Sequence, residues 1–182
     1  MAGKMLAVLR DVNRKVAIAI GIMLLVCAAV VLLDIALRQL GTSFGGTDEI
    51  SGYVMAIATA WGMGFAMLEL GHVRIDILRS RANQIGRSIF DLISMVILSI
   101  TITVIAVQCW PVVSISIANS ARANTPLETP LALVQIPWFA GWIWFAVMAW
   151  LTFLAALMLI FQGRFAEGEA AIGAFSEEDA VL

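Results

Sequence analysis

The chain has 182 residues, of which 62% are hydrophobic and 13% charged, and its mean hydropathy is +0.97. A soluble domain carries about 25% charged residues, so the 11 basic and 13 acidic residues here cannot cover a surface made of so many apolar side chains. This composition excludes a soluble globular protein. The net charge of −2 supplies no basic stripe, so we expect no nucleic-acid partner.

Four long windows contain neither a charged residue nor the single histidine; they are residues 16–33, 50–68, 92–121 and 129–163. A helix that crosses the roughly 30 Å hydrocarbon core of a lipid bilayer needs about 20 apolar residues, and each window reaches this length with its flanking residues. We therefore predict an all-α polytopic membrane protein with a membrane domain over residues 1–165. Its four transmembrane helices are expected at about 14–38, 48–70, 88–118 and 131–163.

The basic residues are distributed unevenly along the chain. Of the 11 Lys and Arg residues, four precede the first span, four lie between the second and third, one follows the fourth, and the other two loops hold one each. Short loops rich in basic residues stay in the cytoplasm, so both termini and the second loop are predicted to be cytoplasmic. A signal peptide would also begin with basic residues. However, this apolar stretch is longer than a typical signal core and lacks a small-x-small cleavage site, so we interpret it as a retained span.

The first loop, residues 39–47, is short and contains three glycines, which predicts an antiparallel hairpin of the first two spans. Thr47 is expected to be the N-cap of the second span. Asp48 and Glu49 fall in its first turn, where the helix dipole favours carboxylates. Gly71 stands where this helix could end.

Asp34 and Arg38 lie four residues apart near the end of the first span, a spacing that favours an ion pair. The predicted hairpin would bring this pair close to Asp48 and Glu49. Two interpretations stay open at this point: ordinary pairing at a helix end, or contact with a partner protein.

The loop between the second and third spans has apolar residues at helical spacing, with arginines largely on other faces. This pattern is typical of an amphipathic helix that lies in the cytoplasmic membrane interface, although an extension of the third span is the alternative. The apolar positions are Ile75, Leu78, Ala82, Ile85 and Ile89.

The third span is long enough that we expect it to tilt, or to break near Trp110-Pro111.

Two further segments flank the fourth span. Trp138, Trp142 and Trp144 open the fourth span as an aromatic belt at the outer interface would. Residues 166–182 are acidic and are predicted to form a flexible cytoplasmic tail.

The sequence offers little for chemistry. Paired histidine ligands for haem are excluded because the single histidine, His72, lies outside the windows. The chain has no metal-ligand cluster and no hydrolase or phosphate-binding motif, so we expect no catalytic residue, no metal and no cofactor. Ion translocation usually requires ionisable groups inside the spans, and the windows contain none.

Small residues recur at every fourth position of the second span: Gly52, Ala56, Ala60 and Gly64. Such a ladder lets another helix approach closely where lipid provides no hydrophobic driving force. We therefore predict a helix-packing seam, whose partner helix could belong to this chain or to another one.

Several of these residues also carry a family resemblance. Arg38, the pair Asp48-Glu49, Trp61-Gly62-Met63-Gly64, and the run from Gly71-His72 to Ile75-Asp76 resemble the small membrane subunit of tripartite ATP-independent periplasmic (TRAP) transporters, the DctQ-like family. One departure is that Gly46-Thr47 stands where the family commonly has an aromatic residue before the acidic pair. The candidate partner contacts are Arg38, Asp48, Glu49, His72 and Asp76.

The resemblance implies a non-enzymatic subunit of the bacterial inner membrane that works with a large membrane subunit and a periplasmic substrate-binding protein. In such a system an ion gradient drives uptake of organic acids, often carboxylates. The small subunit would act as a scaffold and as part of the docking surface for the binding protein. The alternative is a four-helix anchor or assembly subunit of another membrane complex, such as a redox enzyme or a different tripartite carboxylate carrier.

Overall fold

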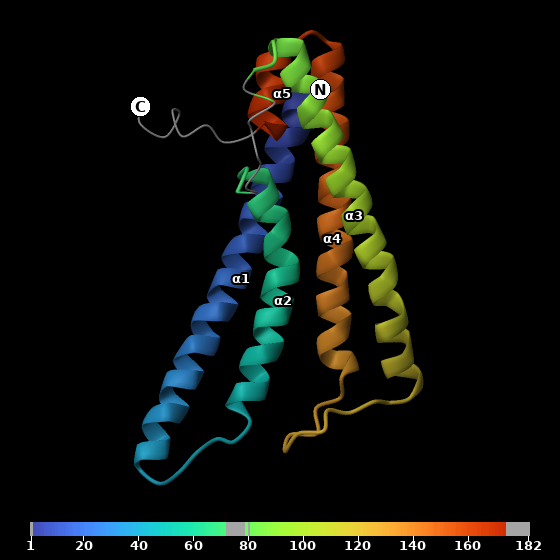
Figure 1. The fold of residues 1–182 in the computed structure, drawn as a ribbon. Coiled ribbons are helices and arrows are strands. Elements are labelled where there is room, and N and C mark those ends of the chain that lie inside the picture. The colour runs from blue at the N-terminus through green and yellow to red at the C-terminus, as the bar shows by residue number, and fades with distance from the viewer. Residues whose placement is uncertain (1, 72–78, 80, 174–182) are drawn as a thin grey trace.

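The computed structural model of the protein describes residues 2–71, 79 and 81–173. Within these residues the chain forms five helices and no strand. The helices are α1 Ala2–Gln39, α2 Thr47–Leu68, α3 Gln84–Ala118, α4 Ala132–Phe161 and α5 Phe165–Ile172 (Figure 1). The first four are long and apolar enough to cross a bilayer, which confirms the predicted all-α membrane protein with four spans.

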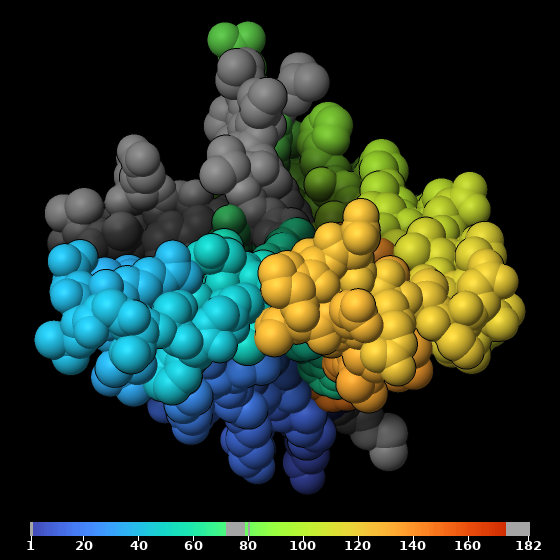
Figure 2. All heavy atoms as spheres, turned by 90° about the horizontal axis from the view of Figure 1, so that it is seen from below, coloured from blue at the N-terminus to red at the C-terminus, as the bar shows by residue number. Residues whose placement is uncertain are grey.

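The four long helices form two antiparallel hairpins, α1 with α2 and α3 with α4, which meet mainly through α2 and α4. The hairpins converge at one end, beside α5 and the N-terminus, and spread apart toward the α1–α2 and α3–α4 loops (Figure 1). We call these the α5 end and the loop end. Viewed from the loop end, the two loops lie side by side (Figure 2). A Cβ atom at Gly46 in one loop would overlap the side chain of Leu127 in the other.

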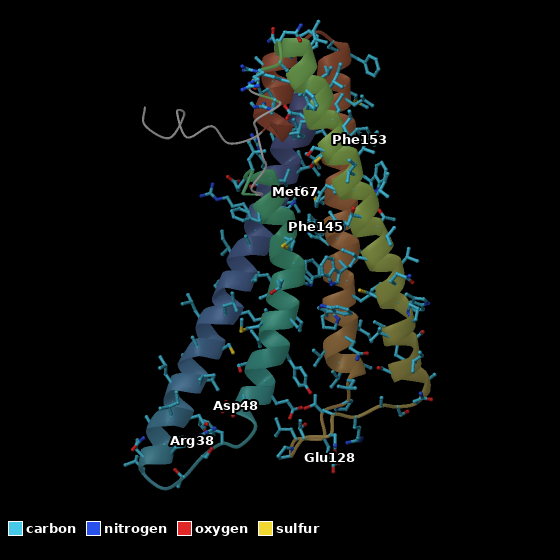
Figure 3. All side chains as sticks on the ribbon, in the orientation of Figure 1. Arg38, Asp48, Met67, Glu128, Phe145 and Phe153 are labelled. Carbon is cyan, nitrogen blue, oxygen red and sulfur yellow. The ribbon has the colours of Figure 1, made fainter. Side chains whose placement is uncertain are left out.

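The α5 end contains the main apolar core. Met67 of α2 and Phe145 of α4 belong to it (Figure 3), and every helix contributes buried side chains. Lipid is as apolar as these side chains, so their burial gives no hydrophobic driving force in the membrane. Close packing between the helices therefore holds this end together. α1 is an exception, because no residue in its most apolar stretch is buried within the chain. That stretch is free to face lipid or another protein.

The start of the predicted flexible tail is ordered. Residues 165–172 form α5, which folds back onto the bundle and buries Ile172 to 1% exposure. Its small residues permit this contact, because a Cβ atom at Gly168 would lie 2.9 Å from Cγ1 of Ile160. The prediction of a flexible tail, made from acidic composition, is therefore wrong for residues 166–172. Residues 174–182 lie outside the described part of the chain.

Arg79 ties α5 to α3. Its Nε and Nη2 atoms donate to the carboxylate of Asp91 at 2.8 and 3.1 Å, and Nη2 also donates to Oε1 of Glu169 at 2.6 Å. Burial by itself would lower the pKa of Arg79. The hydrogen bonds and negative charges of the two acids outweigh that effect and hold the pKa above its usual value, so the guanidinium stays charged.

The end of α2 and the course of α3 differ in detail from the expectation. α2 ends at Leu68, and the residue in the left-handed conformation beyond it is Leu70, with φ 56°, rather than Gly71. The amide of Gly71 instead donates to the carbonyl oxygen of Ala66 and closes the helix end. α3 continues through Pro111 as one helix, so the alternative of a break there is wrong.

The predicted interfacial helix is only partly covered by the structure. Its last residues, from Gln84 onward, form the start of α3, where the side chain of Asn83 accepts a hydrogen bond from the amide of Gly86 at 2.8 Å. Residues 72–78 and 80 lie outside the described residues, so the interfacial position stays a prediction.

Candidate functional site

Asp34 organises the loop end of the α1–α2 hairpin. Its side chain is 1% exposed and accepts hydrogen bonds from Arg38, from two residues of the loop and from the first residue of α2. These last three donors are the hydroxyl of Ser43 at 2.9 Å, the amide of Phe44 at 2.7 Å and the hydroxyl of Thr47 at 2.8 Å. A carboxylate can be buried only when donors surround it, so this set both accommodates the charge and fixes the turn.

Thr47 is not the N-cap of α2, contrary to the sequence-based expectation. Gly46 takes the cap position with φ 72° and provides no side-chain cap. Thr47 is the first helical residue, is buried, and donates its hydroxyl to Oδ2 of Asp34. An ionised acceptor makes a stronger hydrogen bond than a neutral one, so the buried carboxylate recruits this hydroxyl.

Arg38 links Asp34 to Asp48 (Figure 3). Its Nη2 atom lies 2.7 Å from Oδ2 of Asp34 and 3.9 Å from Oδ2 of Asp48. The side chain of Asp48 is 90% exposed, so the longer contact is weak. The hairpin thus brings Arg38 and Asp48 together, and most of the interaction of Arg38 is with Asp34.

Glu49 has a different environment from its neighbour Asp48. Its Oε1 atom accepts a hydrogen bond from the hydroxyl of Tyr53, one turn along α2, at 2.6 Å. Glu49 also lines a pocket with Thr125 and Pro126 from the α3–α4 loop. Asp48 therefore faces Arg38 within the α1–α2 hairpin, whereas Glu49 lies at the contact of α2 with the other hairpin.

The remaining two candidate contacts, His72 and Asp76, lie outside the described residues. Their role as partner contacts stays a prediction.

The small-residue ladder of α2 divides into two halves. Toward the α5 end, Gly64 is buried and Ala60 is fully buried against α4, where a Cβ atom at Gly141 would lie only 2.8 Å from Cβ of Ala60. Toward the loop end, Ala56 is half-buried and Gly52 is exposed, with no atom within 4 Å of a Cβ placed there. One half thus faces α4, and the other leaves open space.

Tryptophan side chains form hydrogen bonds between the helices. Nε1 of Trp144 donates to Asn13 at 3.1 Å, Nε1 of Trp150 to Thr103 at 3.0 Å, and Nε1 of Trp61 to the carbonyl oxygen of Pro137 at 2.9 Å. Trp144 also stacks on Trp61 with ring centroids 5.9 Å apart, so it lies inside the bundle and not in the predicted aromatic belt. Sequence reasoning missed Asn13, because its partner is 131 residues away and no local pattern marks it.

Among residues 2–71, 79 and 81–173, no three His, Cys, Asp or Glu side chains are grouped so that they could hold a metal ion. The polar groups described above contact one another and stabilise helix ends and helix contacts. The arrangement is therefore that of a helical framework with a polar loop end.

Comparison with protein families identifies this framework. Residues 22–160 match the model for the DctQ component of tripartite ATP-independent periplasmic transporters. No curated protein and no solved structure gives a significant match to the chain. The family match covers most of the four long helices and decides against the alternative of an anchor for an unrelated membrane complex. The chain belongs to the DctQ family and is a multi-pass small permease subunit of a TRAP transporter, not an enzyme.

Proposed function

We propose that this subunit is a scaffold in an ion-gradient-driven TRAP transporter that takes up organic acids, often carboxylates, across the bacterial inner membrane. The large membrane subunit would hold the substrate and ion sites and would pack against this chain. Both termini would be cytoplasmic, which places the loop end on the periplasmic side, where the substrate-binding protein docks.

The character of the four long helices is the observation that carries the scaffold role. α3 and α4 continue through Pro111 and Pro137, and none of the four helices is interrupted. Secondary transporters bind substrate and ions at broken helices and at ionisable groups within the membrane, whereas the apolar windows here have no charged residue. A subunit built in this way can support a moving transport element without itself carrying the cargo.

The loop end supports the docking role. Asp48 is almost fully exposed there, and Arg38 is about half exposed beside it. Exposed charges of this kind contribute about 0 to 1 kcal/mol as ion pairs, yet they can steer a charged partner and fix its orientation.

Reconstitution tests the scaffold role directly. We expect liposomes containing this subunit alone to accumulate neither sodium nor an organic acid under an imposed gradient. Liposomes containing both membrane subunits, supplied with the binding protein, should accumulate the acid. Gradient-dependent uptake by this subunit alone, measured with radiolabelled substrate, would overturn the proposal.

A further inference from the structure

A pocket of about 520 Å³ opens at the loop end between the first turns of α2 and the α3–α4 loop. Its walls include Asp48, Glu49 and Tyr53 on one side, and Thr125 and Pro126 on the other, together with two glycines. We call this the loop-end acidic pocket. It is a built feature of both hairpins, because neither hairpin alone supplies both walls.

The charge in this pocket is not balanced by its own lining. Two carboxylates and no Lys or Arg are among the described residues that line it. Within the described part of the chain, the cation in contact with these acids is Arg38, which lies 3.9 Å from Asp48 but makes its short contacts, at 2.7 and 2.8 Å, with Asp34. The pocket therefore presents a net negative charge to whatever faces the loop end.

Glu49 carries a charge that its own contacts do not neutralise. Tyr53 donates to its Oε1 atom, and the hydroxyls of Thr125 and Thr129 lie within hydrogen-bonding reach of its carboxylate. All of these donors are neutral, and a carboxylate makes a stronger hydrogen bond with a positively charged donor than with a neutral one. A positively charged donor that enters the pocket would balance this charge.

We propose that the loop-end acidic pocket binds one lysine or arginine side chain of the periplasmic substrate-binding protein. This inference rests on the proposed function, which places the loop end in the periplasm. A long basic side chain fits the pocket chemically, because its methylene stem can lie along the ring of Tyr53 and along Pro126 while its head contacts Glu49 and Asp48.

The first test measures binding of the transporter's own binding protein to the complex of both membrane subunits in nanodiscs. Glu49→Gln keeps an acceptor for Tyr53 but removes the charge, and should weaken the binding at least tenfold. Asp48→Asn should weaken it less, because Asp48 is open to water. Glu128→Gln is the matched control, since it removes one charge from the exposed α3–α4 loop outside the pocket lining, and should change Kd less than twofold.

The second test identifies the partner group. Glu49→Lys in the small subunit should abolish binding, and reversal of a single exposed Lys or Arg on the binding protein to Glu should restore it. If no single reversal restores binding, or if Glu49→Gln binds like the unchanged complex, the pocket does not hold a basic side chain. If the unchanged complex fails to bind the binding protein at all, the docking role itself fails, and the inference fails with it.

Discussion

Two acidic residues of α1 have the same sequence spacing to a basic residue and very different surroundings. Asp11 pairs with Lys15 at 2.7 Å, and both side chains are exposed. Asp34 pairs with Arg38 at the same distance but is buried and holds the α1–α2 loop through three further donors. Spacing alone makes these pairs look equivalent, and burial separates an incidental pair from one that organises a turn.

This contrast gives a stability prediction. Asp34→Asn should lower the stability of the isolated subunit by about 2 to 3 kcal/mol, because the substituted amide removes the charge and places a donor against donors. Asp11→Asn is the matched control and should change stability by less than about 0.5 kcal/mol. Thermal unfolding in detergent, followed by circular dichroism, measures both. Equal effects of the two substitutions would show that Asp34 is not the organising residue of this loop.

At the scale of the helices, the contact of α2 with α4 depends on small residues from both elements. Ala60 is fully buried, and the absence of a side chain at Gly141 allows the two backbones to approach. The sequence ladder indicates only the α2 side of this contact. The other side, Gly141, belongs to no regular pattern and becomes evident only when the helices are placed together.

A bulky substitution should have different effects on stability in the two halves of the ladder. Ala60→Leu inserts a branched side chain into the closest part of the contact with α4, and such overpacking typically costs about 1 to 3 kcal/mol. It should therefore lower the melting temperature of the isolated subunit.

Gly52→Leu is the control, because the space around Gly52 is open and the melting temperature of the isolated subunit should not fall. The same variant should weaken co-purification of the large subunit if that half of the seam packs against it. An unchanged melting temperature for Ala60→Leu would contradict an internal seam at that position.

At the scale of the whole molecule, the bundle is packed at the α5 end and open toward the loop end. The core residues, the Arg79 ion pairs and α5 all lie at the packed end, whereas the apolar stretch of α1 is unburied. This asymmetry suits a subunit whose remaining apolar surface is covered by lipid and by a second membrane protein.

Orientation in the membrane can be tested with single cysteines in a variant that lacks Cys27 and Cys109. Thr42→Cys and Asn124→Cys, in the two loops of the loop end, should react with an impermeant thiol reagent added to spheroplasts. Gln84→Cys, exposed at the start of α3, should react only after the membrane is permeabilised. Labelling of Gln84→Cys alone from outside would reverse the topology.

The sequence by itself determined the class of protein and the number of spans, because both depend on local composition. A charge-free window of sufficient length is stable in the hydrocarbon core of a bilayer, and a single segment there can satisfy its backbone hydrogen bonds only as a helix. The motifs around Asp48-Glu49 and Gly71-His72 were also sufficient to indicate the family, which the family match over residues 22–160 then showed.

Only the tertiary structure decided which residues stabilise the helix ends and the contacts between helices. Thr47 donates to Asp34 and is not the predicted N-cap, and Trp144 donates to Asn13 inside the bundle and is not in the predicted belt. Helix α5 forms where a flexible tail was expected. Each outcome depends on a partner distant in sequence or on burial, and neither is encoded in spacing or composition. A polar side chain acts according to the donors and the solvent around it, and those are set only when the helices pack.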